Sequence, residues 1–450
     1  MKAILHIGVS KTGSTTIQHF LASNRKELKH RNIYIPVPDR VKSHNTLVLA
    51  SYLPYMLEST SVFSYIGHQV YNSFVEEYFP YLNKEERTLT HCEQCQLWGK
   101  ICCEVETNCS KDDIVIFSAE LLSLFHEDEV EKVRKLMISL FDDVTIVVYL
   151  RRQPEYIVSG YNTSIDWHGA PCTIKEQIPP AYDEIVKLWT IFGKDKIKIR
   201  LFDTKEFHDN DLLSDFAITC GFDITGLKRE KNQNETTMDS AELEFLRLFN
   251  SHVPRLLDPW TVNPDFYPLR QVLLSSQENR EKSKAYRMSR SEAQSILEQC
   301  RDGNDWVARE YLGREKLFSE DVSMYPETVD SPHGLTLEKC VEISAHLWKE
   351  RCNVIHQLQQ KNQQLKSEST ALAELPCLQE EIKSQQTEIQ RSHDDLSLLR
   401  QKHSIYWHYY RYKVLAKITF GKKRKHYKEK RNAFHEKVRQ IRDLCRGKSQ

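Results

Sequence analysis

Short runs of apolar, mostly β-branched residues recur at wide intervals in the first half of the chain. They occupy residues 3–8, 113–117, 144–150 and 197–202, and three of them are nearly continuously apolar. Such runs are typical of central strands in a parallel sheet that helices cover on both faces. Alternating strands and helices predict an α/β fold over residues 1–325. Apolar residues at helical spacing lie between the runs: Ile17, Phe20, Leu21 and Leu28, then Val130, Val133, Met137 and Leu140, then Ile185, Leu188, Trp189 and Phe192.

The pattern changes at about residue 336. No glycine occurs between Gly334 and Gly421, and Gln, Glu, Lys, Ser and Leu dominate. Steps of three and seven between the apolar residues indicate a coiled-coil seam, through which two copies of the chain could form a homodimer. Pro376 interrupts this pattern, so we predict a helical spacer of two segments over 336–403. Ordinary long helices that pack back on the α/β domain are the alternative. The seam residues are Ile355, Leu358, Leu365, Ile382, Ile389, Leu396 and Leu399.

The charge of the chain is divided unevenly, although the net charge of its 450 residues is zero. Residues 401–450 carry 16 basic and 3 acidic residues, a local charge of +13, which leaves −13 on residues 1–400. Aromatic residues are interleaved with this charge in a basic tail over 404–450. Basic amphipathic helices with Trp and Tyr bind anionic bilayers, so we predict an anionic membrane surface as partner. The aromatic residues are Tyr406, Trp407, Tyr409, Tyr410, Tyr412, Phe420, Tyr427 and Phe434.

Two alternatives to membrane binding stay open for the tail. Nucleic acid would also suit its charge, but no nucleic-acid motif occurs and the acidic body would repel a polyanion, so we expect none. A solvated tail without function is the other. The sequence has no run of about 18 apolar residues, which predicts no transmembrane helix. We expect a cytoplasmic protein, peripherally associated with the inner face of the membrane.

The 12 cysteines are too few for a disulfide scaffold, which favours reduced thiols. Five of them cluster at Cys92, Cys95, Cys102, Cys103 and Cys109. Zinc requires four N or S ligands, and the second pair lacks the usual spacing. Cys92, Cys95 and Cys102 instead fit an apolar helix stripe, so we predict thiols without a metal.

Candidate chemistry begins in the segment 6–16, which passes from a strand into a helix. A glycine-bearing turn there directs backbone N–H groups and a helix N-terminus at an anion. Gly8, Gly13 and Thr15 have the spacing of the ATP-binding P-loop, which predicts a P-loop-like parallel sheet flanked by helices. The lysine, however, is Lys11, before the second glycine, where it can contact an oxygen that bridges a phosphate and a transferred group. An ordinary turn with a solvated lysine is the alternative.

A second constellation follows the strand at 144–150. Arg151 ends this strand, and Ser159 lies eight residues later on the next helix. Ligands bind at the carboxyl ends of strands in open α/β sheets, and an arginine with a hydroxyl can grip a phosphate there. Arg152 lies seven residues from Ser159 and is the less favoured partner.

These two motifs resemble those of the sulfotransferases that use 3′-phosphoadenosine-5′-phosphosulfate (PAPS). The resemblance covers residues 1–325, and the end of this region is similar to bacterial carbohydrate-type members. It implies a domain that moves a sulfuryl group from PAPS to a carbohydrate hydroxyl, such as a bacterial surface polysaccharide or glycolipid, without a metal. It implies a phosphosulfate loop of Lys11, Thr12, Gly13, Ser14, Thr15 and Thr16, a 3′-phosphate site of Arg151 and Ser159, and Lys11 as a catalytic residue.

The resemblance also implies a general base near the end of an early strand, either His or Glu. Glu120 follows the strand at 113–117 and is the predicted base. Its alternative role is a helix N-terminal Glu that favours the helix dipole. His44 is the other candidate, although a surface-loop histidine is the simpler interpretation. A P-loop nucleotide kinase and a non-catalytic nucleotide-binding tether or scaffold remain as alternative functions.

Overall fold

A computed structural model describes most of the chain in separate stretches. They are residues 1–37, 43–51, 91–229, 238–258, 261–264, 288–329, 334–373, 383–395 and 421–446, with a few single residues between them. The chain divides into two compact units, Met1–Ile343 and Ser344–Gln450, which are described separately below.

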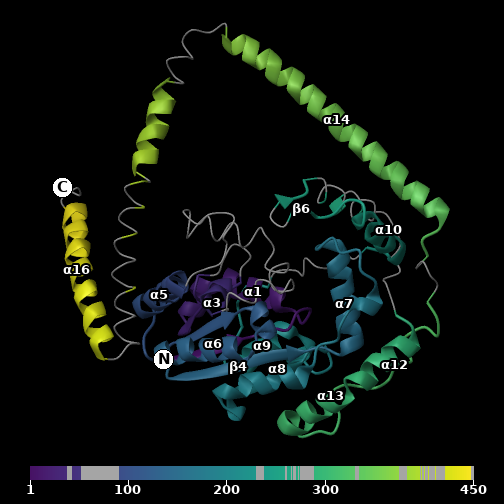
Figure 1. Cartoon of the computed structure of the whole chain (residues 1–450), viewed down its shortest axis with the longest axis horizontal. Helices are drawn as coiled ribbons and strands as arrows, with labels where there is room; N and C mark the ends of the chain where they lie inside the picture. Colours follow the sequence, from purple (N-terminus) through teal and green to yellow (C-terminus); the bar gives the residue numbers. More distant parts are fainter. Residues whose placement is uncertain are drawn as a thin grey trace. The chain divides into compact units, whose positions relative to one another are not determined.

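A five-stranded parallel sheet forms the centre of the first unit (Figure 1). Its strands are β1 (Lys2–His6), β2 (Ile33–Tyr34), β3 (Ile114–Ser118), β4 (Asp143–Leu150) and β5 (Ile197–Leu201), in the order β2-β3-β1-β4-β5. The four predicted strands are present, which confirms the α/β prediction, and β2 adds a fifth. Since β1 lies between β3 and β4, three strand ends meet at the centre of one sheet edge.

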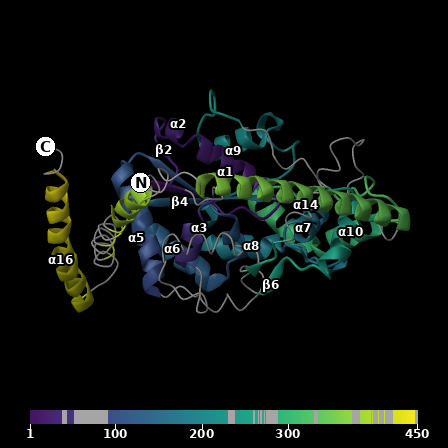
Figure 2. The ribbon, with the colours of Figure 1, turned by 90° about the horizontal axis from the view of Figure 1, so that it is seen from above.

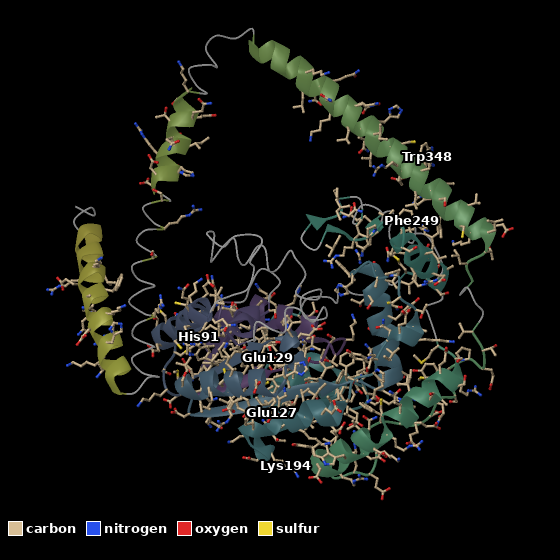
Figure 3. All side chains as sticks on the ribbon, viewed as in Figure 1. His91, Glu127, Glu129, Lys194, Phe249 and Trp348 are labelled. Carbon is tan, nitrogen blue, oxygen red and sulfur yellow. The ribbon has the colours of Figure 1, made fainter. Side chains whose placement is uncertain are left out.

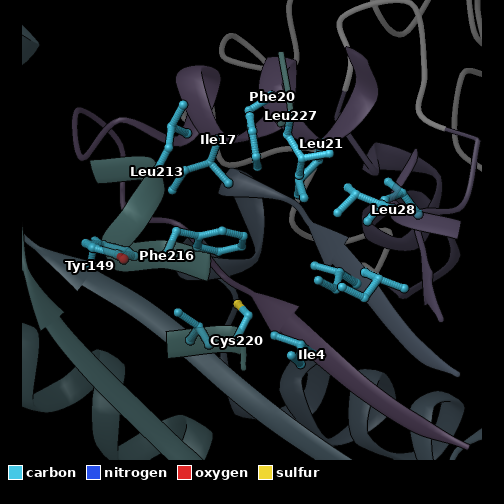
Figure 4. Close-up of a cluster of buried hydrophobic side chains, with 14 residues drawn as sticks. Ile4, Ile17, Phe20, Leu21, Leu28, Tyr149, Leu213, Phe216, Cys220 and Leu227 are labelled. Atoms are coloured by element: carbon cyan, nitrogen blue, oxygen red, sulfur yellow. The ribbon is translucent and has the colours of Figure 1, made fainter. Parts of the chain in front are cut away.

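One face of the sheet is covered by α1 (Ser14–Ser23), α2 (Arg25–Lys29) and α9 (Leu212–Cys220). Figure 4 shows the cluster of buried side chains in this layer, where Ile17 and Phe216 pack with Tyr149 of β4. The helical spacing that begins at Ile17 is therefore confirmed, although Asn24 separates it into two helices.

The helices α6 (Glu127–Leu140) and α8 (Tyr182–Trp189) pack against each other, and α6 contacts β4. They belong to a layer that also contains α3 (Asn45–Ser51) and α5 (His91–Asn108), which contact each other. In the predicted apolar stripe of α6, Val130, Val133 and Met137 are buried and Leu140 is half-buried. In the predicted stripe of α8, Trp189 is buried, whereas Ile185 and Leu188 are half-buried and Val186 is buried in their place.

The helix α7 (Gln153–Asp166) packs on α10 (Ser240–Asn250) and α12 (Arg290–Gln299). The other elements are α13 (Arg301–Val307), a π-helical turn at Ala308–Leu312, and an antiparallel pair of β6 (Leu256–Asp258) and β7 (Thr261–Val262). Short 3-10 helices span Glu120–Leu124, Ile174–Glu176, Thr190–Phe192, Lys194–Lys196 and His208–Asn210.

The C-terminal part contains α14 (Leu337–Ala373), a helical stretch at 383–395, and α16 (Gly421–Arg446), seen again from above in Figure 2. The predicted spacer is therefore helical over the described residues, whereas its coiled-coil pairing stays a prediction. Pro376, three of the seam residues and the aromatic residues of 406–420 lie outside the described stretches. None of the described helices is long and apolar enough to cross a membrane.

Candidate functional site

The predicted motifs converge at the carboxyl edge of the sheet. His6 at the end of β1 lies opposite Ser118 of β3 and Val147 of β4 in the strand register. The loop after β1, Glu120 after β3 and Arg151 after β4 therefore approach one another, although more than 100 residues separate the first from the others. Parallel sheets bind their ligands at this edge.

The loop between β1 and α1 has a tight, left-handed backbone. Lys11 and Gly13 have φ values of 66° and 79°. A Cβ atom on Gly13 would lie 2.4 Å from Leu212 and 2.8 Å from Phe202, so only glycine fits. The buried Thr12 hydroxyl donates to the Val9 carbonyl at 2.5 Å and closes the turn. The loop thus leads directly into the N-terminus of α1, where backbone N–H groups favour an anion.

Lys11 is half-buried, and its ammonium crosses the edge of the sheet to α7. Its Nζ donates to the Thr163 hydroxyl at 2.7 Å, and that hydroxyl donates to the Ser159 carbonyl at 3.1 Å. Burial lowers the pKa of Lys11, and the Arg151 charge acts in the same direction, whereas Glu120 and Asp166 oppose it. Lys11 is therefore a held cation rather than a solvated one. Thr163 escaped the sequence analysis, although it lies one helical turn after Ser159.

Arg151 holds the backbone of the loop between β1 and α1. Its Nη1 donates to the Lys11 carbonyl at 2.9 Å, and its guanidinium lies 5.3 Å from the centre of the Phe202 ring. Its backbone N–H donates to the Tyr182 hydroxyl at 3.1 Å, and burial lowers the pKa of its side chain. Among the contacts of the described residues, none joins Arg151 to the half-buried Ser159 hydroxyl, so the two flank the edge without touching.

Arg152 points away from this edge. Its guanidinium donates to the Ser319 carbonyl at 2.7 Å and to the Asp321 carbonyl at 2.8 Å, and it pairs with Glu155 at 2.6 Å. It therefore fastens the segment 317–327 to α7. The two adjacent arginines have different surroundings, in line with the preference for Arg151.

Glu120 and the loop are joined by a direct contact. Glu120 begins a 3-10 helix after β3, and its Oε2 accepts a hydrogen bond of 2.8 Å from the buried Ser14 hydroxyl. Thr15 is exposed at the start of α1 and Thr16 is half-buried. A carboxylate thus lies at the loop, on the same edge as the Lys11 ammonium.

His44 is buried, and its expected position on a surface loop is wrong. Its Nδ1 accepts the Ser118 N–H at 2.9 Å, and its Nε2 donates to the Pro36 carbonyl at 3.2 Å in that tautomer. Burial lowers its pKa to about 4. Because both ring nitrogens have backbone partners, His44 braces the end of β3 and is unsuited to act as a base.

A second buried histidine lies beneath the loop and escaped the sequence analysis. The Nδ1 of His6 is 2.8 Å from the Ser118 hydroxyl, and its ring packs edge-on against Phe216. Burial lowers the pKa of His6 to about 3. A Cβ atom on Gly8 would lie 3.1 Å from the His6 ring, which places that ring directly against the loop between β1 and α1.

Basic and aromatic side chains line the end of α7 next to Lys11. The Asp166 carboxylate pairs with Arg270 at 2.5 and 3.0 Å, and the Arg270 guanidinium lies 3.7 Å from the centre of the half-exposed Trp167 ring. Burial, Arg255 and Lys11 together lower the pKa of His168 to about 4. This rim offers a planar cation and an aromatic face.

The cysteines of α5 only partly follow the predicted stripe. Cys102 is buried beside Trp98, whereas Cys92 is exposed. Within the described residues, no three His, Cys, Asp or Glu side chains are grouped as metal ligands would be.

No family model matches the sequence, and no solved structure matches the chain. A protein of Archaeoglobus fulgidus described as uncharacterized is 24% identical to this chain over 233 residues. The match covers 51% of this chain and 62% of the length of that relative. These comparisons assign neither a family nor an activity, so a functional conclusion has to come from the residues of the site.

Proposed function

We propose that this chain is a PAPS-dependent sulfotransferase that acts on a hydroxyl group of a carbohydrate. The observation that carries the proposal is the position of Lys11. Its backbone is held by Arg151, its ammonium lies at the carboxyl edge of the sheet, and Glu120 contacts Ser14 in the same loop. A cation and a carboxylate at one anion-binding loop suit transfer of an anionic group to a hydroxyl.

The donor would bind along the loop and the end of β4. The backbone N–H groups of residues 12–16 would hold the 5′-phosphate at the N-terminus of α1. The Thr12 hydroxyl already donates to Val9, so this residue would contribute its N–H group instead. Arg151 uses Nη1 on the Lys11 carbonyl and retains further donors, which with the Ser159 hydroxyl would hold the 3′-phosphate.

The reaction would be an in-line displacement at sulfur. The acceptor oxygen bonds to sulfur while the bond from sulfur to the bridging phosphate oxygen breaks, and the electron pair stays on that oxygen. Lys11 would exchange the Thr163 hydroxyl for this oxygen and stabilise its charge. Glu120 would take the proton of the acceptor hydroxyl. The products are a sulfate ester and adenosine 3′,5′-bisphosphate.

The rim at the end of α7 supports a carbohydrate as the acceptor. The half-exposed Trp167 would offer one face of its ring to a sugar ring. The Arg270 guanidinium stacks on the Trp167 ring and would hold it in place from the opposite face. The Asp166 carboxylate of this rim lies close enough to Lys11 for its negative charge to raise the pKa of the Lys11 ammonium. An acceptor that contacts Trp167 would therefore lie close to the reacting group.

The basic charge of the tail supports a location of the enzyme at a membrane surface. We propose that the tail 404–450 binds an anionic membrane surface and holds the enzyme near a lipid-linked or surface glycan. Within the tail, the described side chains of α16 include exposed Lys425, Lys428 and Lys430, which suit anionic headgroups.

The donor assignment is tested by calorimetry with adenosine 3′,5′-bisphosphate and AMP. A charge-assisted hydrogen bond contributes about 1.5–3 kcal/mol, so we expect a preference for the bisphosphate of roughly 10²-fold. Arg151→Ala should remove most of this preference. Arg152→Ala is the matched control, because Arg152 is engaged by the 317–327 segment, and it should retain the preference.

Equal affinity for the two nucleotides would exclude the proposed 3′-phosphate site. A parallel assay offers PAPS and ATP to the full chain with a mixture of sugar acceptors. Transfer of phosphate from ATP would indicate the kinase alternative. Tight binding of the bisphosphate without sulfate transfer to any acceptor would indicate a nucleotide-binding tether.

A further inference from the structure

An apolar stripe runs along the 37-residue helix α14. Val341, Trp348 and Ile355 are spaced seven residues apart. Leu358 lies three residues after Ile355, and Leu365 lies seven residues after Leu358. The exposed fractions run from 47% for Ile355 to 73% for Trp348, which is labelled in Figure 3. In heptad notation the first series occupies a positions and the second occupies d positions. An exposed apolar stripe of this kind marks a surface to which another helix or protein binds.

Two polar residues interrupt the stripe and restrict what can cover it. Asn362 continues the a series, and Arg351 occupies a d position. In a parallel pair each residue faces its own copy, so Arg351 would face a second Arg351 in the seam. Lys361 at g would also face Lys366 at e of the second copy. Like charges in these places are destabilising, which argues against a parallel pair.

An antiparallel pair with one particular register removes both conflicts. When Ile355 faces Leu358 of a second copy, Arg351 faces Asn362 of that copy. Its guanidinium can then donate to the Asn362 amide oxygen. Every pairing occurs twice about a two-fold axis between Ile355 and Leu358, as a closed dimer interface requires.

The outer layers and the flanks of this register are also compatible. Trp348 faces Leu365, which pairs a large side chain with an aliphatic one in both outer layers. The flanking e and g positions bring Val354 next to Lys361 of the second copy, without like charges. The paired segment 348–365 covers about 26 Å at 1.5 Å per residue.

We propose that α14 binds α14 of a second copy of this chain as an antiparallel two-stranded coiled coil. Ile355 lies opposite Leu358 and Arg351 opposite Asn362 in this dimer. The proposal does not depend on the sulfotransferase assignment. Its rival is a hairpin within one chain between α14 and the helical stretch at 383–395, where Ile389 is also exposed.

The test is sedimentation equilibrium of the full chain with two opposite charges at position 362. Asn362→Asp gives Arg351 of the second copy an ion pair in both symmetric places, so the dissociation constant should fall about tenfold. Asn362→Lys places like charges there and should raise it about tenfold or more. Adding Arg351→Glu to Asn362→Lys should restore dimerisation. Gln360→Lys, on the opposite face of the helix, is the matched control and should change little.

Each alternative gives a different result. A parallel dimer would be weakened by both charges at position 362, because each would face itself, and the double variant would stay weak. A hairpin within one chain, or an unpaired helix, would leave every form monomeric at tens of micromolar. Either outcome overturns the proposal. Cross-linking provides a second measurement: a mixture of Trp348→Cys and Leu365→Cys chains should form a 348–365 disulfide that mass spectrometry identifies.

Discussion

Acidification should destabilise the α/β unit through its two buried histidines. Burial lowers the pKa of His6 to about 3 and that of His44 to about 4, whereas an unfolded histidine titrates near 6.5. The folded state therefore excludes a proton that the unfolded state binds. The contribution of these residues to stability is complete above pH 6.5 and is lost as the pH falls from 6.5 toward the folded pKa values.

The magnitude follows from the difference in protons bound. Between pH 7 and pH 5 each histidine should reduce the free energy of unfolding by about 2 kcal/mol, so the pair should remove about 4 kcal/mol. That is a large part of the 5–15 kcal/mol typical of a folded domain. Replacing His6 by Gln removes one titrating group and should reduce the loss by about 2 kcal/mol.

Urea unfolding at pH 7, 6 and 5 measures this effect. The fluorescence of the buried Trp98 and Trp189 reports on the α/β unit. The comparison uses the change in unfolding free energy with pH, so a lower absolute stability of His6→Gln does not affect it. An identical pH dependence in the variant, or a loss below about 1 kcal/mol in the unmodified chain, would refute the reasoning.

Three further predictions concern the loop, the carboxylate and the tail. Glu120→Gln should leave nucleotide binding intact and reduce turnover by roughly 10²-fold or more, while Glu127→Gln, on the exposed start of α6, should not; a normal rate in the first variant would reassign the base. In thermal unfolding, Gly13→Ala should destabilise the chain by about 1–3 kcal/mol more than Gly226→Ala. Both glycines have φ 79°, but only at Gly13 would the added Cβ atom clash with neighbouring side chains. Equal destabilisation by the two variants would mean that the clash at Gly13 contributes nothing beyond the backbone strain that both share. The full chain should sediment with anionic vesicles in a salt-sensitive way, and a chain that ends at Arg400 should not; equal sedimentation of the two would exclude the tail as the anchor.

The sequence by itself determined the parts of this protein that depend on local pattern. Nearly continuous apolar runs identified three of the five strands of the sheet, since a strand covered on both faces has few polar positions. The β-rich run at 197–202 identified a fourth, β5, although Lys198 and Arg200 interrupt its apolar residues. The glycine spacing located the loop that holds Lys11, because Gly13 must adopt a left-handed backbone. A run of Gln, Glu, Lys and Leu without glycine predicted the long helix α14. The two-residue strand β2 was missed because it is too short to have a period.

Only the tertiary structure decided which of these parts meet. Ser14 and Glu120 are 106 residues apart, and Lys11 and Thr163 are 152 residues apart. Their contacts follow from the strand order β2-β3-β1-β4-β5, which no local pattern contains. The same holds for His44, whose burial results from backbone partners at Pro36 and Ser118. Periodicity records which face of an element is apolar, whereas the partner of a polar side chain is set by elements distant in the sequence, and so it becomes fixed only when the sheet is assembled.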